Sequence, residues 1–197
     1  FDGAMSHANV YINGQKVGYW PYGYNSFHFD ITKYLKPGEK NTLAVRLENL
    51  PESSRWYPGA GLYRNVHLII TEDAYIPVWG TYITTPSVNE KFAKVNVRTK
   101  VVLPEGADPA KYSVETSVWN PNKQKLTAVR TSLAQMKYNN NQAEQEFVIQ
   151  APSLWSPEMP ALYSAETRLY EGDKLKDIYT TPFGIRSIEI IPDKGFF

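Results

Sequence analysis

Cysteine is absent from the 197 residues, which excludes a disulfide framework, a thiol nucleophile and a cysteine-based metal site. Neither positive nor negative charge is in large excess: the formal net charge is +1, and the Lys and Arg residues are scattered along the chain. No nucleic-acid partner is expected, since such proteins concentrate basic side chains on one face. No apolar run is long enough for a membrane-spanning helix, so no membrane span is expected.

A long helical pattern, an internal repeat and a low-complexity tract are also lacking. The chain is instead rich in aromatic and turn residues, with 14 Tyr, 5 Trp, 14 Pro and 12 Gly. The Pro and Gly residues separate short apolar runs, a pattern typical of β-strands joined by tight turns. An all-β protein of one or two domains is therefore predicted.

The first seventy residues contain four stretches in which apolar and polar residues alternate, as in half-buried strands. These stretches are 8–19, 27–31, 43–47 and 66–70. The first is interrupted by Asn13-Gly14, the dipeptide that a type I′ hairpin turn prefers. After the second, Asp30 or Thr32 is expected to cap one helical turn that ends at Leu35. The pattern predicts a hairpin and further strands in this part of the chain.

Residues 71–80 interrupt the alternation and are interpreted as a linker between domains. Beyond them, seven apolar stretches are predicted to be short strands. They lie at 81–85, 93–103, 112–119, 126–133, 143–149, 162–170 and 175–181. Seven short strands in about one hundred residues is the size of an immunoglobulin-like sandwich.

Three prolines interrupt the segment before the sixth of these strands. Pro152, Pro157 and Pro160 cannot donate to a central ladder, so the segment is predicted to cross between two sheets. Leu154 and Trp155 are expected to plug the end of the core, where burial of the indole contributes about 3–5 kcal/mol relative to Ala. A structural role is therefore favoured for Trp155.

Three longer motifs point to a known family: SRWYPGAGLYRNVHL at 54–68, LWSPEMPALY at 154–163 and PFGIRSIEIIPDKGFF at 182–197. Two further stretches, VYINGQKVG at 10–18 and FDITKYLKPGEKNTLAVRLEN at 29–49, agree with them in order and spacing. Together, over essentially the whole chain, they resemble the β-galactosidase branch of glycoside hydrolase family 2.

The resemblance implies two sandwiches in series. Residues 1–74 resemble the C-terminal part of the family's sugar-binding jelly roll, a galactose-binding-like β-sandwich. Residues 75–190 resemble the immunoglobulin-like β-sandwich that follows it. Residues 191–197 resemble the lead into the catalytic (β/α)8 barrel, which is expected to follow Phe197. The first residues resemble mid-domain strand, so the natural N-terminus is expected to lie upstream.

The resemblance further implies a retaining β-galactosidase whose two catalytic glutamates, about 5–5.5 Å apart, belong to the barrel. No catalytic residue is therefore assigned in this chain, which is expected to scaffold the barrel, wall the galactoside pocket and show no turnover alone. Asn89-Glu90 matches the family's acid/base dipeptide but lies in a polar turn. Glu48 and Glu52 are interpreted as solvated, or as paired with Arg46 or Arg55. Two alternatives stay open: a β-glucuronidase or β-mannosidase parent, and a stand-alone carbohydrate-binding or adhesion module.

The loop 50–61 holds the candidate substrate-binding residues Arg55, Trp56 and Tyr57. Sugar C–H faces pack on aromatic rings, and sugar hydroxyls bond to Arg or Tyr. In the family, this part of the jelly roll helps to shape the galactosyl pocket. The alternative is that both aromatics anchor the jelly roll to its neighbours, the more common role of large aromatic side chains.

Some family members place an aspartate just before the aromatic of this loop, where it binds a sodium ion and the sugar. Ser54 or Arg55 stands there in this chain, so no metal and no cofactor is assigned to it. Whether the parent uses a monovalent or divalent cation stays open. A second aromatic loop, 21–27, carries Tyr22 and Tyr24 and is interpreted first as an interface.

The implied partners are β-galactoside saccharides, bound through the parent enzyme, and the catalytic barrel; a homo-oligomer is left open. A partial jelly roll in residues 1–74 is expected to expose unpaired sheet edges, so this part should self-associate or depend on docking to the sandwich. By family analogy the compartment is periplasmic or extracellular.

Overall fold

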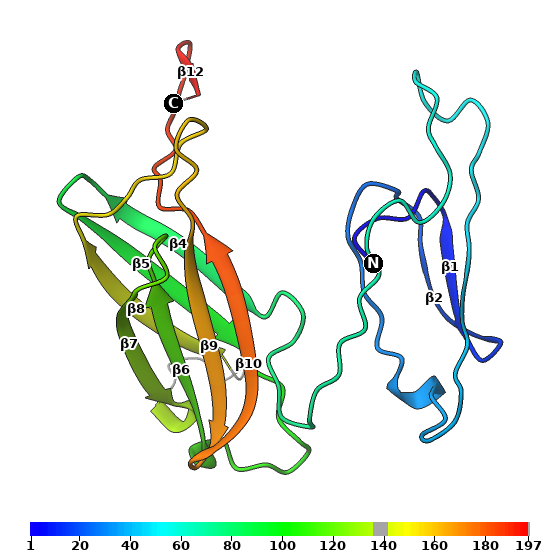
Figure 1. Ribbon diagram of the computed structural model, residues 1–197, viewed down its shortest axis with the longest axis horizontal. Helices are drawn as coiled ribbons and strands as arrows, with labels where there is room; N and C mark the ends of the chain where they lie inside the picture. Colours follow the sequence, from blue (N-terminus) through cyan, green and yellow to red (C-terminus); the bar gives the residue numbers. More distant parts are fainter. Residues whose placement is uncertain (136–141, 197) are drawn as a thin grey trace. The chain divides into compact units, whose positions relative to one another are not determined.

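The computed structural model describes residues 1–135 and 142–196, and its regular structure is almost entirely β (Figure 1). The helical segments of that part are three 3-10 turns: η1 (Thr32–Tyr34), η2 (Pro109–Lys111) and η3 (Leu133–Gln135). The chain divides into two compact units, Phe1–Ile69 and Ile70–Phe197. None of the described helices is long and apolar enough to cross a membrane. The all-β fold class is confirmed.

The first unit contains an antiparallel sheet of three strands in the order β2-β1-β3. The strands are β1 (Ala8–Ile12), β2 (Gln15–Trp20) and β3 (Leu43–Arg46). Asn13 and Gly14 join β1 to β2 with φ values of 51° and 81°. Positive φ at both central residues is the requirement of a type I′ turn, so the predicted hairpin is confirmed.

A small aromatic core holds the first unit together. Ala4, Ala8, Val10 and Phe27 are its buried members. The Phe27 ring lies between two other rings, with centroids 4.9 Å from Phe1 and 5.7 Å from Trp20. The core therefore joins β1 to a segment that follows β2, although that segment is not itself a strand.

Two strands predicted in the first unit are absent from the structure. Residues 27–31 form no strand; they lead into η1, where the Asp30 carboxylate accepts a hydrogen bond from the Thr32 N–H at 2.8 Å. Residues 66–70 form no strand either, and Leu68 and Ile70 are 70% and 85% exposed. Both predictions were wrong because alternation only makes a segment suitable for a sheet, whereas a strand also needs a neighbouring backbone.

The second unit contains all seven predicted strands. They are β4 (Thr81–Val88), β5 (Phe92–Lys100), β6 (Tyr112–Trp119), β7 (Lys125–Ser132), β8 (Gln142–Gln150), β9 (Tyr163–Glu171) and β10 (Lys174–Phe183). Two antiparallel sheets, β4-β5-β8 and β10-β9-β6-β7, face each other as the layers of a sandwich (Figure 1). The fourth strand, β7, pairs with β6, whereas in a constant-type immunoglobulin domain it joins the other sheet. A short hairpin follows, of β11 (Ile190–Ile191) and β12 (Gly195–Phe196).

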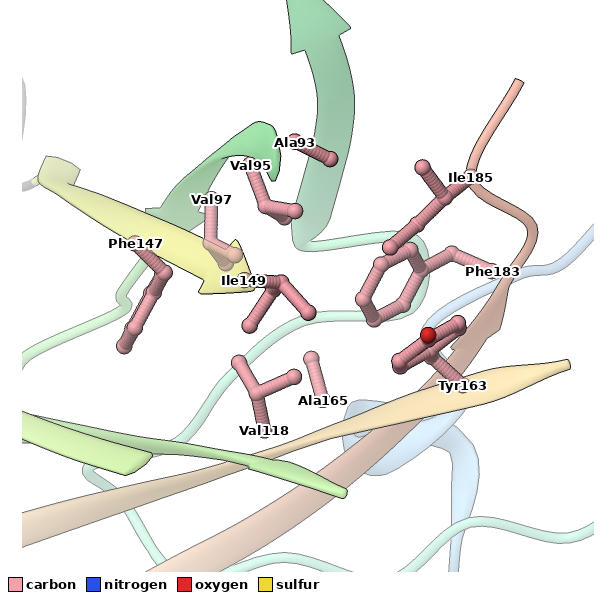
Figure 2. Close-up of a cluster of buried hydrophobic side chains, with 10 residues drawn as sticks. All are labelled: Ala93, Val95, Val97, Val118, Phe147, Ile149, Tyr163, Ala165, Phe183 and Ile185. Carbon is pink, nitrogen blue, oxygen red and sulfur yellow. The ribbon is translucent and has the colours of Figure 1, made fainter. Parts of the chain in front are cut away.

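Two apolar clusters fill the sandwich. Figure 2 shows the first, in which Val95, Val97 and Ile149 face Val118 and Ala165 of the opposite sheet. The second cluster gathers near the other strand ends. Its buried members are Ala74, Ile76, Val101, Tyr112, Val114, Leu133, Ala143 and Leu169.

A polar belt separates the two clusters. Four strands each contribute a buried polar side chain that lies between apolar ones: Thr99 on β5, Thr116 on β6, Gln145 on β8 and Thr167 on β9. The Thr116 and Thr167 hydroxyls are 3.2 Å apart, in hydrogen-bond contact between neighbouring strands. Buried polar groups need such partners, because leaving one unpaired costs about 1–3 kcal/mol.

The Gln145 side chain bridges the two sheets. Its Nε2 donates to the carbonyl oxygens of Val114 at 3.1 Å and Val129 at 2.8 Å, and to the Thr131 hydroxyl at 3.1 Å. The acceptors belong to β6 and β7, while Gln145 belongs to β8. A polar contact across the core is tied to specific carbonyls, so it fixes how the two sheets align in a way that apolar packing does not.

We predict that Gln145→Ala lowers the free energy of unfolding of the second unit by about 2–3 kcal/mol, because it removes three hydrogen bonds between the two sheets. Urea unfolding followed by fluorescence measures this loss. Gln150→Ala, at the exposed end of the same strand, is the matched control and should change stability by less than about 0.5 kcal/mol. Equal losses in both variants would contradict the role given to the bridge.

The segment expected to be a linker is part of the sandwich. Ala74 and Ile76 are buried in the second cluster. The Asp177 carboxylate accepts from the Ile76 N–H at 2.8 Å, and the Tyr179 hydroxyl accepts from the Trp79 N–H at 3.1 Å. Side chains of the edge strand β10 therefore hold residues 76–79 in place, although no ladder joins them. The linker interpretation, based on the interrupted alternation, missed this because the partners lie about one hundred residues away.

Lys176 completes this attachment with an ion-pair cluster. Its side chain is only 9% exposed, and its Nζ lies 2.5 Å from Glu72, 3.7 Å from Asp73 and 3.8 Å from Glu171. The hydrogen bond from Lys176 is the main cause that lowers the pKa of Glu72. The bond to Glu72 likewise raises the pKa of Lys176. Each group therefore favours the charged form of the other.

We expect the second unit to lose stability in acid partly through this pair. Glu72 has a lowered pKa in the folded chain, so its contribution is complete above the ordinary value of 4.5 and is lost as pH falls through the folded value. Lys176→Met should reduce stability at neutral pH and flatten the decline between about pH 5 and pH 3. Urea midpoints at several pH values test this. Lys125→Met, an exposed lysine on β7, should leave the decline unchanged.

The proline-rich segment 151–162 differs in part from its prediction. Trp155 is half-buried, donates its backbone N–H to the Ile185 carbonyl at 2.9 Å and lies under the Arg186 guanidinium at 4.7 Å. Gly184 packs so closely on the indole that a Cβ there would approach Trp155 to 2.9 Å. Leu154 is exposed, so its expected place in the core was wrong. Of these two residues, only Trp155 packs against the end of the sandwich, and it lies outside the apolar core.

Candidate functional site

The two aromatic loops of the first unit meet. The Trp56 Nε1–H of loop 50–61 donates to the Tyr24 hydroxyl of loop 21–27 at 3.0 Å. Tyr22 lies edge-on to Tyr24, with ring centroids 5.5 Å apart. Tyr22, Tyr24 and Trp56 are called the aromatic cluster below. Nothing in the spacing of the sequence signals that the loops touch, so Tyr24 was not placed beside the candidate residues.

Backbone contacts at the base of the loops explain why they converge. The Tyr63 hydroxyl donates to the Gly23 carbonyl at 2.8 Å. Gly23 packs against Met5, where an added Cβ would lie 2.4 Å from the sulfur. Met5 in turn pairs antiparallel with Gly61, through hydrogen bonds of 3.0 and 3.2 Å. Residues 1–5 thus hold one loop on each side.

The candidate residues are exposed within the unit. Trp56 is 61% exposed and Tyr57 is 96% exposed. Arg55 is exposed as well and forms no ion pair with the other described residues. The loop also encloses a shallow hollow of about 460 Å³, lined by residues 49–54 and 56–58. The three side chains therefore remain available to a ligand or to a neighbouring domain.

The arrangement suits binding rather than proton transfer. Aromatic faces accept the C–H side of a sugar ring, and a guanidinium donates to hydroxyl or carboxylate oxygens. The acidic residues in and beside the loop are Glu52, which is exposed, and Glu48, which is half-buried and pairs with Arg46 at 2.9 Å.

Several carboxylates elsewhere in the described residues have structural partners. Three of them surround Lys176, which lowers the pKa of Glu72, the opposite of what a general acid requires. Asn89 is a turn residue whose side-chain oxygen accepts from the backbone N–H groups of Lys91 and Phe92, each at 2.9 Å. Its neighbour Glu90 is exposed. The Asn-Glu dipeptide therefore has a structural account.

The described residues contain no cluster of three or more His, Asp or Glu side chains that could hold a metal. His7 is bonded to the Tyr19 hydroxyl at 2.6 Å, and His67 to the Asp2 carboxylate at 2.8 Å. Of Ser54 and Arg55, the two residues that the sequence resemblance places where some family members carry a metal-binding aspartate, Ser54 accepts from the Trp56 N–H through its hydroxyl at 3.5 Å. A cation requirement of the parent protein stays a prediction.

We predict that Tyr24→Phe speeds exchange of the Trp56 indole N–H with solvent, because the hydroxyl that accepts its hydrogen bond is removed. The indole resonance in a ¹⁵N-labelled sample reports this directly. Tyr22→Phe is the matched control, since Tyr22 contacts the cluster through its ring. The stability of the unit should change by less than about 1 kcal/mol in both variants. Unchanged indole exchange in Tyr24→Phe would rule out the bond.

Comparison with known proteins gives two family matches that together cover most of the chain. Residues 1–72 match the sugar binding domain of glycosyl hydrolases family 2. Residues 75–186 match a second domain described as glycosyl hydrolases family 2. The matches follow the order of the two units and confirm the resemblance found in the sequence motifs.

Similar proteins include enzymes of two specificities. A β-galactosidase of Bacteroides ovatus is 39% identical over 197 residues, and a putative β-glucuronidase of Formosa agariphila is 37% identical over 199 residues. The comparison covers the whole chain but only 23% and 18% of these relatives. A crystal structure of a family 2 glycosyl hydrolase from Bacteroides cellulosilyticus superposes with a TM-score of 0.86 at 33% identity, over 100% of this chain and 25% of that one. The chain therefore belongs to glycoside hydrolase family 2 and comprises its sugar-binding domain and the β-sandwich domain that follows.

Proposed function

We propose that this chain is the non-catalytic N-terminal portion of a retaining β-galactosidase-type glycoside hydrolase. In that enzyme it scaffolds the catalytic barrel and walls part of the galactoside pocket. The observation that carries the proposal is the aromatic cluster together with Arg55 and Tyr57. These exposed side chains are of the kinds that bind sugars, and they lie in a domain that matches a sugar-binding family. The galactoside assignment draws on the Bacteroides ovatus relative.

The absence of a suitable carboxyl pair in the described residues supports a non-catalytic role. Retaining hydrolysis needs one carboxylate as nucleophile and one protonated carboxyl as acid, about 5–5.5 Å apart. Glu72, Asp73 and Glu171 gather around Lys176, whose ammonium group lies within 3.8 Å of each of them. The hydrogen bond from Lys176 lowers the pKa of Glu72, the opposite of what the protonated acid requires.

A β-glucuronide is the second candidate substrate of the parent. Arg55 is exposed and forms no ion pair with the described residues, and a guanidinium binds a carboxylate through two parallel hydrogen bonds. The relatives include β-glucuronidases. Arg55→Met in the full-length enzyme separates the two: it should raise KM for a nitrophenyl glucuronide about tenfold more than for a nitrophenyl galactoside if glucuronide is the substrate.

We predict that the 197-residue chain alone does not hydrolyse nitrophenyl β-galactoside or β-glucuronide, even at high protein concentration. In the full-length enzyme, Trp56→Ala should raise KM by up to about tenfold with a smaller effect on kcat, as expected for loss of an aromatic contact of about 0.5–1.5 kcal/mol. Trp79→Ala, another exposed tryptophan, is the control. Sustained turnover by the 197-residue chain that persists through repurification would disprove the non-catalytic role.

A stand-alone carbohydrate-binding module is the rival function. Titration of the 197-residue chain with galactose, lactose and glucuronic acid, followed by tryptophan fluorescence, distinguishes the two. Millimolar binding that disappears in Trp56→Phe would favour an autonomous site. No response up to molar sugar, together with the KM effect in the full-length enzyme, would favour a pocket wall that works only beside the barrel.

The remaining properties of the parent follow from the same proposal. We propose that a polysaccharide-degrading enzyme of this family acts in the periplasm or outside the cell, where its substrate lies. A homo-oligomer and a monovalent or divalent cation at the active site are compatible with it. Fractionation of the producing cells, light scattering and activity after chelation are the corresponding measurements.

A further inference from the structure

The turn that joins β1 to β2 carries a pair of residues that can react with each other. Asn13-Gly14 is the one Asn-Gly dipeptide of the 197 residues. In such a pair the backbone nitrogen of the glycine can attack the side-chain carbonyl carbon of the asparagine, because glycine has no side chain to obstruct the approach. Gly14 is exposed, and a Cβ added to it would meet no described residue within 4 Å. Crowding at Gly14 therefore does not prevent the attack.

The Asn13 carboxamide, by contrast, is held through both of its polar atoms. Its Nδ2 donates to the Tyr34 carbonyl at 3.0 Å and to the Asn41 Oδ1 at 2.8 Å. Its Oδ1 accepts from the Thr42 N–H at 3.0 Å. Attack by Gly14 requires the carboxamide to turn and its Nδ2 to leave, and both movements break these bonds. The folded turn therefore restrains the reaction that its sequence permits.

Asn41 presents its acceptor from a second turn, residues 36–41. The Asn41 Oδ1 also accepts from the Lys36 N–H at 2.8 Å, and the Asn41 Nδ2 donates to the Lys36 and Glu39 carbonyls at 3.0 and 2.9 Å. Asn13 and Asn41, called the asparagine pair below, thus join the hairpin to this turn. The joint depends on an amide at residue 13, because an amide both donates and accepts whereas a carboxylate only accepts.

We propose that Asn13 is a deamidation site, that the asparagine pair sets its rate, and that deamidation separates the hairpin from the 36–41 turn. The Gly14 nitrogen loses its proton and bonds to the Asn13 Cγ. The bond from Cγ to Nδ2 breaks, and Nδ2 leaves with that proton as ammonia. Water then opens the five-membered imide at one of its two carbonyls, which leaves aspartate or isoaspartate at residue 13.

Both products lack the donor that joins the two turns. A carboxylate at residue 13 still accepts from the Thr42 N–H, but it meets the Tyr34 carbonyl and the Asn41 Oδ1 with no hydrogen to share. Asn41 must then turn its amide over and give up the Lys36 N–H, or move away. Isoaspartate also adds one carbon to the backbone of a two-residue turn, which shifts the pairing of β1 with β2.

Peptide mass mapping across residue 13, after incubation of the full-length protein at mildly alkaline pH, measures the reaction. A synthetic peptide of residues 8–19 gives the rate without the asparagine pair. Residue 13 should react at least about tenfold more slowly in the protein than in the peptide, and Asn41→Ala should remove most of that difference. Asn49→Ala, at an exposed asparagine of the same unit whose side chain bonds to Pro58 instead, is the matched control and should leave the rate unchanged.

Three results would overturn the proposal. The first is an equal rate in the peptide and in the protein, and the second is a rate in Asn41→Ala that stays at the wild-type value. Amide exchange at Val10, a buried residue of β1, distinguishes local release from unfolding of the whole unit. The third is therefore acceleration at Val10 in Asn41→Ala as large as that of deamidation, which would assign the effect to unfolding.

Asn13→Asp in the full-length protein tests the consequence without waiting for the reaction. The Lys36 amide should exchange about tenfold faster in this variant, whereas the Thr42 amide keeps its acceptor and should change little. Asn49→Asp introduces the same charge into the same unit and should leave both amides unchanged. Unaltered exchange at Lys36 in Asn13→Asp would contradict the separation of the two turns. Neither experiment depends on the proposed enzymatic function.

Discussion

Backbone pairing is the constraint on which both units depend, because a buried N–H or C=O without a partner costs more than most side-chain contacts supply. The second unit meets it with seven strands in two sheets. Its edge strands β4 and β10 carry Pro86 and Pro182, residues that sheets tolerate at their edges. In the first unit, the backbone pairing that continues the β1–β2 hairpin ends at Phe1 and Phe27, which exchange two hydrogen bonds of 3.0 Å. Beyond that pair, sequences suited to strands lie exposed.

The edges of the second unit are joined by side chains instead of a ladder. Thr81 and Thr181 share a hydrogen bond of 2.5 Å, and Thr85 donates to the Arg186 carbonyl at 2.9 Å. With Asp177 and Lys176 binding the residues before β4, these contacts join the open side of the sandwich. Directional bonds of this kind, and Gln145 within the core, specify one alignment of the sheets. Apolar packing alone tolerates several alignments of similar energy.

The strands of the second unit could be predicted from the sequence because the alternation of apolar and polar residues is a local signal. Alternation in β5 and β8 matches buried and exposed positions residue by residue, and Asn13-Gly14 forms its turn from two residues. Contacts between distant segments left no such signal. The attachment of Ile76 to Asp177, and of Trp56 to Tyr24, depends on which polar groups the fold brings together. Leu154 was misplaced for the same reason, since composition cannot tell which side of a crossing segment faces inward. The exposure of Arg55, Trp56 and Tyr57 agrees with a loop reading, while their ligand depends on what surrounds that loop.

Electrostatics bears on the proposal that these two sandwiches bind and support while a separate barrel catalyses. Catalysis by a carboxyl pair requires one group kept protonated near neutral pH, which takes burial away from cations. Antiparallel sandwiches place charged residues on their outer faces, where water and neighbouring lysines or arginines favour ionisation. Glu72 beside Lys176 follows that rule. Loops at the end of a sheet can still present aromatic rings at little cost, because a ring needs no altered pKa to bind a sugar face. The proposed division of labour between a binding loop and a separate catalytic barrel agrees with what each architecture can stabilise.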